Sequence, residues 1–211
     1  MRVTAELPEQ PVVSSAAPAA SNQGQQPEWV TPELPPAYND LARQIAALKQ
    51  EAAKFESFGA LLWQTGQPLV RAVRDVFAAM RFDAGLAENG ASYDAHVQLD
   101  ANRRLLLQVI GSSGPINKQS PKITQILQTI QQEATEHDRI VLVANVYCET
   151  PVRDRTLEPV TPDALRLILG LGANLVVAST LFGLWKFSLQ DLDDARKSVF
   201  SLHKLNGGIY R

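Results

Sequence analysis

The sequence predicts an α/β fold in which a mixed central sheet lies between helices. Two strand-like segments, 93–99 and 104–110, flank a turn-forming Asp-Ala-Asn triplet and predict a hairpin. The segment 140–147 is largely apolar and rich in β-branched residues, as expected for a central strand covered on both faces. Helical periodicity separates the strands, and the order helix, two strands, helix, strand, helix, strand, helix predicts a sheet between helical layers.

The composition bounds the size and class of the protein. The chain of 211 residues is long enough for one well-buried domain with some appended sequence. Its 45% hydrophobic residues and net charge of −2 are those of an ordinary globular protein. Cys148 is the single cysteine, so an intramolecular disulfide is excluded and a reducing cytoplasm is expected. Because Cys148 ends an apolar strand-like run, a buried structural thiol is favoured over a catalytic one.

The N-terminal residues 1–36 are rich in Pro, Ala, Ser and Gln and poor in residues that form a core. This composition predicts a disordered tail, without the apolar segment of a secretory signal. Trp29, Val30 and Leu34 form the sizeable apolar group of the tail. They are interpreted either as incidental apolar residues or as a short docking motif.

Residues 37–57 are predicted to form an amphipathic, coiled-coil-like helix with Asp40 as its N-cap. Apolar residues recur there at alternating spacings of 4 and 3, which is the seam of a heptad pattern. The residues of this apolar stripe are Leu41, Ile45, Leu48, Ala52 and Phe55. Isolated helices of this length are marginal, so the stripe must pack on something. Three partners stay open: the chain's own domain, a second copy in a dimer seam, and another cytoplasmic protein.

The remaining residues, 58–211, are predicted to form the α/β domain. Apolar residues from Leu61 to Met80 recur at helical spacing, but Gly66 and Pro68 interrupt them. This pattern predicts a short helix, a turn at 65–67 and a helix from Pro68. After the hairpin, the turn residues 112–115 and the apolar spacing from Ile123 to Ile130 predict a further helix.

The segment 165–185 is apolar enough to resemble a membrane span, but Gly170 and Gly172 interrupt it. A spanning helix needs roughly 20 predominantly apolar residues without such breaks. The segment is therefore predicted to form the end of a helix, a strand at 175–178 and the start of a second helix, and no membrane span is expected. Thr161 and Pro162 predict the start of the first helix, with a capping hydroxyl. The last helices are expected after Ser179 and Asp191.

Four segments of the domain together carry a family resemblance. They are the segment 61–69, Tyr93-Asp94, the segment 107–111, and 141–145 with Pro151 and Arg155 downstream. In this order they resemble the restriction-endonuclease-like superfamily, the PD-(D/E)XK nucleases, and in particular its small bacterial domains. The resemblance covers about residues 58–187 and implies a restriction-endonuclease-like fold. In that family, one strand carries an aspartate, the next strand carries an acid and a lysine, and these residues converge on a divalent cation.

The sequence departs from the family at the positions of this chemistry. Val70 stands where the opening helix often has a glutamate, Gln108 replaces the second acid, and Ile110 replaces the lysine. Only Asp94 fits, and one carboxylate cannot assemble a site for Mg²⁺, which requires several oxygen ligands. The resemblance therefore implies a nuclease fold that has lost cleavage, with no cofactor. His96, two residues beyond Asp94, would add one nitrogen ligand on the same strand face, and a further ligand is missing.

The charge distribution does not favour a nucleic-acid groove. Residues 1–57 carry 4 Lys or Arg against 7 Asp or Glu, and residues 58–211 carry 16 against 15. Phosphate binding requires a surplus of basic residues on one face. The candidates for a weak basic patch are Arg103, Arg104, Lys118, Lys122, Arg153 and Arg155.

Two functions of different classes follow from these observations. The first is a catalytically inactive nuclease-fold module that joins itself or another cytoplasmic protein through its N-terminal helix and tail. The second is a protein that acts on nucleic acid, either as a binder or as a metal-dependent nuclease with a non-standard site. The first is preferred because Asp94 is the only family residue of the metal site that is kept.

Overall fold

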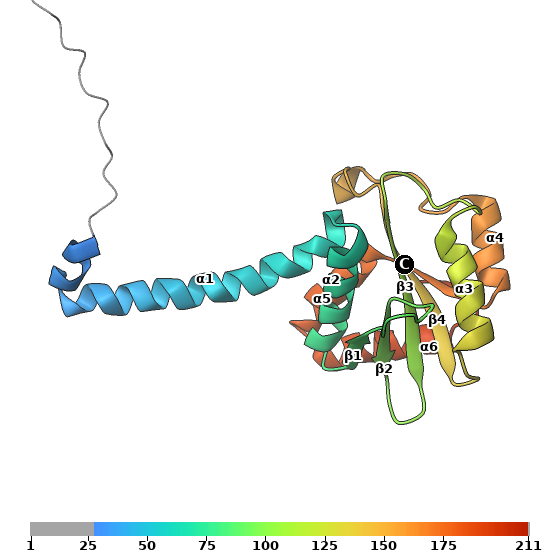
Figure 1. Ribbon diagram of the computed structural model, residues 1–211, viewed down its shortest axis with the longest axis horizontal. Coiled ribbons are helices and arrows are strands. Elements are labelled where there is room, and N and C mark those ends of the chain that lie inside the picture. The colour runs from blue at the N-terminus through green and yellow to red at the C-terminus, as the bar shows by residue number, and fades with distance from the viewer. Residues whose placement is uncertain (1–27, 211) are drawn as a thin grey trace, which may run out of the picture. The chain divides into compact units, whose positions relative to one another are not determined.

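The computed structural model describes residues 28–210, which contain a mixed six-stranded sheet flanked by helices (Figure 1). The chain divides into two units after Leu48. Residues 1–27 of the predicted tail lie outside the described residues. In the described part of the predicted tail, residues 28–33 form a 3₁₀ helix, η1 (Glu28–Glu33). Trp29 within it is exposed.

The predicted amphipathic helix is present and is longer than expected. Helix α1 (Pro36–Trp63) begins at a proline, a residue whose fixed φ suits the first turn of a helix. The prediction of Asp40 as N-cap is therefore wrong, and Asp40 instead pairs with Arg43 on the helix surface at 3.2 Å. The boundary expected between residues 57 and 58 falls inside α1.

The sheet has the order β1-β2-β3-β4-β5-β6. Strands β1 to β3 pair antiparallel, and β3 to β6 pair parallel. The bounds are β1 (Asp83–Leu86), β2 (Ala95–Gln98), β3 (Arg104–Ser112), β4 (Asp138–Val146), β5 (Asn174–Val177) and β6 (Ile209–Tyr210). The expected hairpin is β2 and β3, and the expected central strand is β4. The two edge strands, β1 and β6, were not predicted.

Helices cover both faces of the sheet. They are α2 (Gly66–Ala79), α3 (Pro121–Gln132), α4 (Pro162–Gly170), α5 (Ala178–Ser188) and α6 (Leu192–Lys204), with a short 3₁₀ helix η2 (Val152–Asp154) after β4. Alternate residues of β3 enter two different cores because successive side chains of a strand point to opposite faces. Leu105 and Leu107 pack with α2, α5 and α6, whereas Leu106 packs with α3 and α4 (Figure 1).

The turn between α1 and α2 lies at Gln64 and Thr65, and α2 begins at Gly66, two residues before the predicted start at Pro68; Gly66 has a φ of 58°. A positive φ is a conformation that glycine adopts without a steric penalty. Gly111 on β3 makes the close packing of this turn possible, since a Cβ there would lie 2.8 Å from the Cα of Thr65. A side chain at position 111 would push the turn away from the sheet.

Two further expectations about helix starts can be compared with the structure. Thr161 precedes α4, with Pro162 in the first turn, but its hydroxyl makes no capping hydrogen bond. Asp191 precedes α6 and its carboxylate accepts a hydrogen bond from the backbone N–H of Asp194 at 2.9 Å. The division of segment 165–185 into helix, strand and helix is confirmed by α4, β5 and α5.

Candidate functional site

Asp94 is the residue around which the candidate site is built. It lies directly before β2, and its backbone N–H donates to Leu107 O at 2.9 Å. Its carboxylate Oδ2 accepts a hydrogen bond from the backbone N–H of Val109 at 2.6 Å. The side chain of Asp94 thus takes the place of a backbone carbonyl at the point where the β2–β3 ladder ends.

Lys122 of α3 reaches the same carboxylate, although 28 residues separate the two in sequence. Its Nζ lies 2.7 Å from Oδ1 and 2.5 Å from Oδ2 of Asp94, and 3.4 Å from Oε1 of Gln108. The side chains of Lys122 and Asp94 are only 19% and 18% exposed. An ion pair so far removed from water is held in place, because breaking it would leave a poorly solvated charge.

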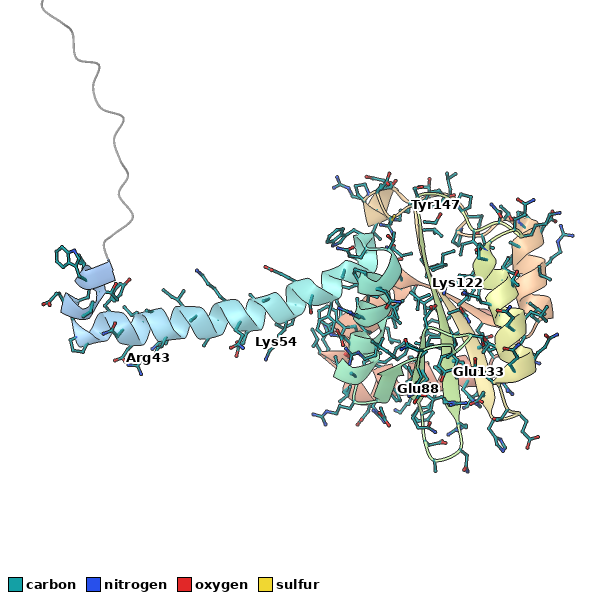
Figure 2. The ribbon with its side chains drawn as sticks, viewed as in Figure 1. Arg43, Lys54, Glu88, Lys122, Glu133 and Tyr147 are labelled. Carbon is teal, nitrogen blue, oxygen red and sulfur yellow. The ribbon has the colours of Figure 1, made fainter. Side chains whose placement is uncertain are left out.

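Gln108 completes this cluster from β3. Its side chain is fully buried and faces α3. Its amide Nε2 donates to Ser92 O and, at 3.0 Å, to the hydroxyl of Thr129. The loop before β2 is tied to the end of α3 by a second bond, from the backbone N–H of Ser92 to Glu133 Oε1 at 2.5 Å. Figure 2 shows Lys122 and Glu133 on this side of the sheet.

The structure brings together only part of the predicted site. Asp94 and Gln108 share one polar cluster, and Lys122, predicted as a nucleic-acid contact, joins them. Val70 lies in the apolar core between α2 and the sheet. Ile110 packs against the other core, beside α3 and α4. These two positions therefore carry hydrocarbon on opposite faces of the sheet.

His96 of β2 packs against Tyr93 and Gly85. Its ring packs edge-on against Tyr93, with ring centroids 6.3 Å apart. The ring also covers Gly85 of β1, where an added Cβ would lie 2.6 Å from a ring carbon. Within residues 28–210, the structure contains no group of three or more His, Cys, Asp or Glu side chains that could hold a metal ion.

Two of the six basic candidates are held by carboxylates, one in the β2–β3 turn and one at the start of β4. Arg103 Nε donates to Asp100 Oδ2 at 2.7 Å. The hydrogen bonds that the Asp100 carboxylate accepts, of which this one has the largest effect, lower the pKa of Asp100 to about 2. Arg104 forms two hydrogen bonds of 3.0 Å with Asp138. Burial alone would raise the pKa of Asp138, but the hydrogen bonds from Arg104 and Thr135 outweigh it and lower the pKa.

The remaining basic candidates have different surroundings. Lys118 is exposed in the loop before α3, and Arg153 is exposed beside Asp154 at 3.7 Å. Arg155 instead donates to Thr150 O at 2.8 Å, to Asn145 Oδ1 at 2.9 Å and to Leu62 O. Burial lowers the pKa of the Arg155 guanidinium from its ordinary value. Most of the six predicted contacts are thus engaged within the chain.

Arg155 and Asn145 form an anchor for the end of α1 that the sequence did not reveal. Leu62 O and Gln64 O are among the carbonyls that a helix leaves unpaired at its C-terminus. Arg155 donates to the first, and Asn145 Nδ2 donates to the second at 2.9 Å. The available signal was the polar Asn145 within an apolar strand, because a buried amide requires hydrogen-bond partners.

The apolar stripe of α1 is open to solvent in the described chain. Leu41, Ile45 and Leu48 are 57%, 52% and 63% exposed. Phe55 is also exposed, although its ring lies 6.0 Å from that of Trp185 on α5. The C-terminal part of α1 is better packed, since the ring centroids of Phe58 and Trp185 are 4.4 Å apart.

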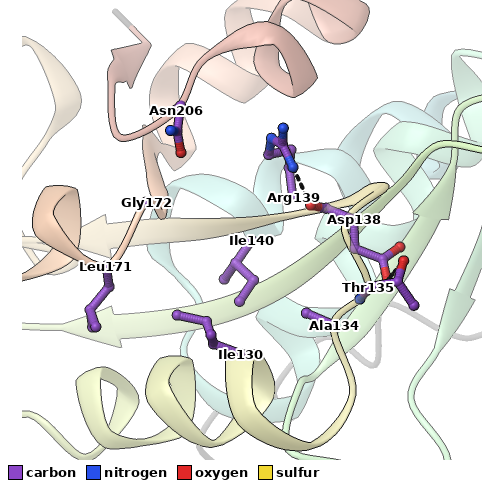
Figure 3. A pocket seen from close by; sticks show the side chains of 9 residues that line it. All are labelled: Ile130, Ala134, Thr135, Asp138, Arg139, Ile140, Leu171, Gly172 and Asn206. Atoms are coloured by element: carbon purple, nitrogen blue, oxygen red, sulfur yellow. Dashed lines mark hydrogen bonds between the residues drawn. The ribbon is translucent and has the colours of Figure 1, made fainter.

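A cavity of about 190 Å³ lies apart from the Asp94 cluster, at the start of β4 (Figure 3). Its lining includes Arg139, Ile140, Leu171 and Asn206. Arg139 Nη1 donates to Asp138 O at 2.8 Å and to Glu136 O at 3.1 Å. These hydrogen bonds, with that from the backbone N–H of Thr135 to Asp138 Oδ2 at 2.9 Å, close the turn before β4.

None of the helices within residues 28–210 is both long enough and apolar enough to span a membrane. Comparison of the chain with protein-family models, with curated proteins and with solved structures gave no match.

Proposed function

We propose that the chain is a non-cleaving module with a restriction-endonuclease-like fold whose role is assembly, with a second copy of itself or with another protein, in the cytoplasm. The positions of the remnant residues support the fold: Asp94 stands directly before one strand, and Gln108 and Ile110 lie on the strand that pairs with it. This is the arrangement implied by the family resemblance. The paired sheet therefore provides a framework for a metal site whose ligands have been replaced.

The observation that carries the proposal is that both oxygens of the Asp94 carboxylate already have partners within the chain. Its two oxygens already accept from Lys122 and from the backbone N–H of Val109. A divalent cation would have to displace the Lys122 ammonium and would meet only a neutral amide at Gln108. Hard cations bind where several carboxylate or carbonyl oxygens converge, so this cluster favours the lysine over the metal.

The apolar stripe of α1 supports the assembly role. Its side chains are exposed along a helix whose end is anchored by Arg155 and Asn145. Contiguous exposed apolar surface marks a site of protein contact. The regular heptad spacing fits a second helix, and we propose a second copy of the chain as its partner.

A mass and a cleavage measurement test this function. We expect the purified chain to be a dimer by light scattering and to leave plasmid DNA and RNA intact in the presence of Mg²⁺ or Mn²⁺. Cleavage that disappears in Asp94→Ala would overturn the non-cleaving role. A monomeric mass at micromolar concentration would overturn the assembly role.

One specific observation favours a second candidate, a metal-dependent nuclease with a lysine from α3. Lys122 Nζ lies within 3.4 Å of both Asp94 and Gln108, where it could supply the positive charge that Ile110 lacks. Such a charge would stabilise a phosphoryl transition state. This candidate requires that Lys122→Met and Asp94→Ala each abolish cleavage of nucleic acid, while Lys118→Met, which alters an exposed lysine nearby, retains it.

A further inference from the structure

The apolar stripe of α1 extends one layer beyond the residues at 41–55. Tyr38 precedes Leu41 by three positions and is 45% exposed, so it continues the heptad spacing towards the start of the helix. The stripe thus begins and ends with an aromatic ring, Tyr38 and Phe55. Leu41, Ile45, Leu48 and Ala52 lie between them.

The residues that flank the stripe decide how two copies can align. In a parallel coiled coil, the residue before one core position contacts the residue after a core position of the other helix, whereas in an antiparallel one residues of the same kind contact each other, so these contacts set orientation. In a parallel pair, Glu51, before Ala52, would lie beside Glu56, after Phe55, and symmetry would repeat this contact. Like charges so close oppose association. The flanking charges therefore disfavour a parallel dimer.

An antiparallel alignment removes this repulsion. When Ile45 faces Leu48 of the second copy, Leu41 faces Ala52 and Tyr38 faces Phe55. Leu41 then meets the small Ala52, the ring of Tyr38 meets that of Phe55, and the branched aliphatic chains of Ile45 and Leu48 meet each other, which allows close packing. The flanking pairs become Gln44 with Glu51 and Ala42 with Lys49, so no like charges meet.

Charge and overlap of the two stripes together select the register of the antiparallel pair. A shift by one heptad would place Ile45 opposite Phe55 of the second copy. Lys49 would then face Lys49 across the twofold axis, and Glu51 would face Glu51. The opposite shift, with Ile45 opposite Leu41, avoids both contacts but leaves Ala52 and Phe55 beyond the stripe of the second copy. The alignment with Ile45 opposite Leu48 therefore combines the full overlap of the stripe with the absence of like-charge contacts.

We infer that two copies of the chain pair through α1 in antiparallel orientation, with Ile45 opposite Leu48, Leu41 opposite Ala52 and Tyr38 opposite Phe55. The inference rests on the assembly role proposed above and specifies its partner and geometry. A twofold, self-complementary interface of this kind closes after two copies. The stripe is then buried between the two copies and offers no surface to a third chain.

Single cysteines on the stripe test the orientation. In a Cys148→Ala background, which removes the native thiol, one chain carries Leu41→Cys and a second, of different mass through a tag, carries Ala52→Cys. A short bismaleimide should link the two chains to each other in the mixed dimer. Each variant alone should give at least tenfold less linked product, since copies of residue 41 lie about 16 Å apart along the antiparallel helices, from a rise of about 1.5 Å per residue.

The outcomes separate the inference from the function on which it rests. Efficient linking of Leu41→Cys chains to each other would show a parallel dimer, which overturns the orientation and leaves the assembly role intact. A monomeric mass for the unaltered chain would overturn both. Glu56→Ala is the charge control: it removes the parallel repulsion and should leave the dissociation constant of an antiparallel dimer within about twofold of the original value.

Discussion

The Asp94 cluster and the apolar stripe of α1 differ in how their groups are satisfied. Around Asp94, carboxylate, ammonium and amide groups find partners within the same chain, from β3, α3 and the loop before β2. Along the stripe, Leu41, Ile45 and Leu48 face solvent. Polar groups that are already paired have little free energy to gain from a ligand, whereas exposed apolar surface gains about 25 cal/mol for each Å² that it buries. The driving force for the assembly that we propose therefore lies on the helix and not at the Asp94 cluster.

The largest expected effect is on the stripe itself. The double variant Ile45→Asp/Leu48→Asp puts carboxylates into the central layers of the seam, where burial of an unpaired charge is strongly unfavourable. We expect the dimer to become a monomer by light scattering, with unchanged circular dichroism. The control Arg43→Asp, a change of charge on the same helix outside the stripe, should remain dimeric.

Breaking the ion pair of the polar cluster should have the next largest effect. Asp94→Ala leaves Lys122 and the Val109 N–H without their partner. Because the pair is about one-fifth exposed, we expect the free energy of unfolding in urea to fall by about 2 kcal/mol, below the 3–5 kcal/mol for a fully buried pair. The double variant Asp94→Ala/Lys122→Met should recover part of this loss. A fall no larger than that in Lys197→Met, which breaks an exposed pair, would contradict a structural role for Asp94.

The anchor of α1 should contribute less. Arg155→Met removes donors to Leu62 O, Thr150 O and Asn145, and we expect a loss of about 1–2 kcal/mol, because carbonyls near the helix end regain water. Hydrogen exchange should rise in the last turn of α1. The exposed neighbour Arg153 provides the control, since Arg153→Met should change stability by less than about 0.5 kcal/mol.

The smallest effect concerns pH. The pKa of Asp138 is lowered in the folded chain, so its pair with Arg104 adds stability that is present above the unfolded pKa of 3.8. This stability is lost as the pH falls through the lower, folded pKa. The free energy of unfolding in urea is measured at pH 7 and at pH 3, and Asp138→Asn should reduce the difference between these two free energies. An unchanged difference would show that the pair is not coupled to folding.

Local sequence signals predicted most of the fold. The Asp-Ala-Asn turn predicted the β2–β3 hairpin, and the β-branched run predicted β4. The edge strands were missed because they are short and β1 contains a glycine, which weakens the strand signal. The start of α1 was misplaced because Asp40 suits an N-cap, while Pro36 suits a first turn equally well.

The candidate site was less predictable because several of its partners are far apart in the sequence. Asp94 and Gln108 could be identified because each lies at a fixed position on a predicted strand. The partner of Asp94, Lys122, comes from a helix whose rotation about its axis decides which side chains face the sheet. The same holds for Arg155, whose contact with Leu62 O joins residues 93 positions apart. Such pairs depend on packing, which periodicity alone does not describe.

The hydrogen bonds from Arg155 and Asn145 to the end of α1 affect which substitutions this sequence can accept during evolution. Both donors grip main-chain oxygens at positions 62 and 64, and these oxygens are present whatever amino acids occupy those sites. Replacements at 62 and 64 leave these hydrogen bonds intact. The side chains at positions 145 and 155 are hydrogen-bonded to each other, so a replacement of one constrains the residue at the other. Among natural variants, these two should therefore be kept or exchanged as a couple.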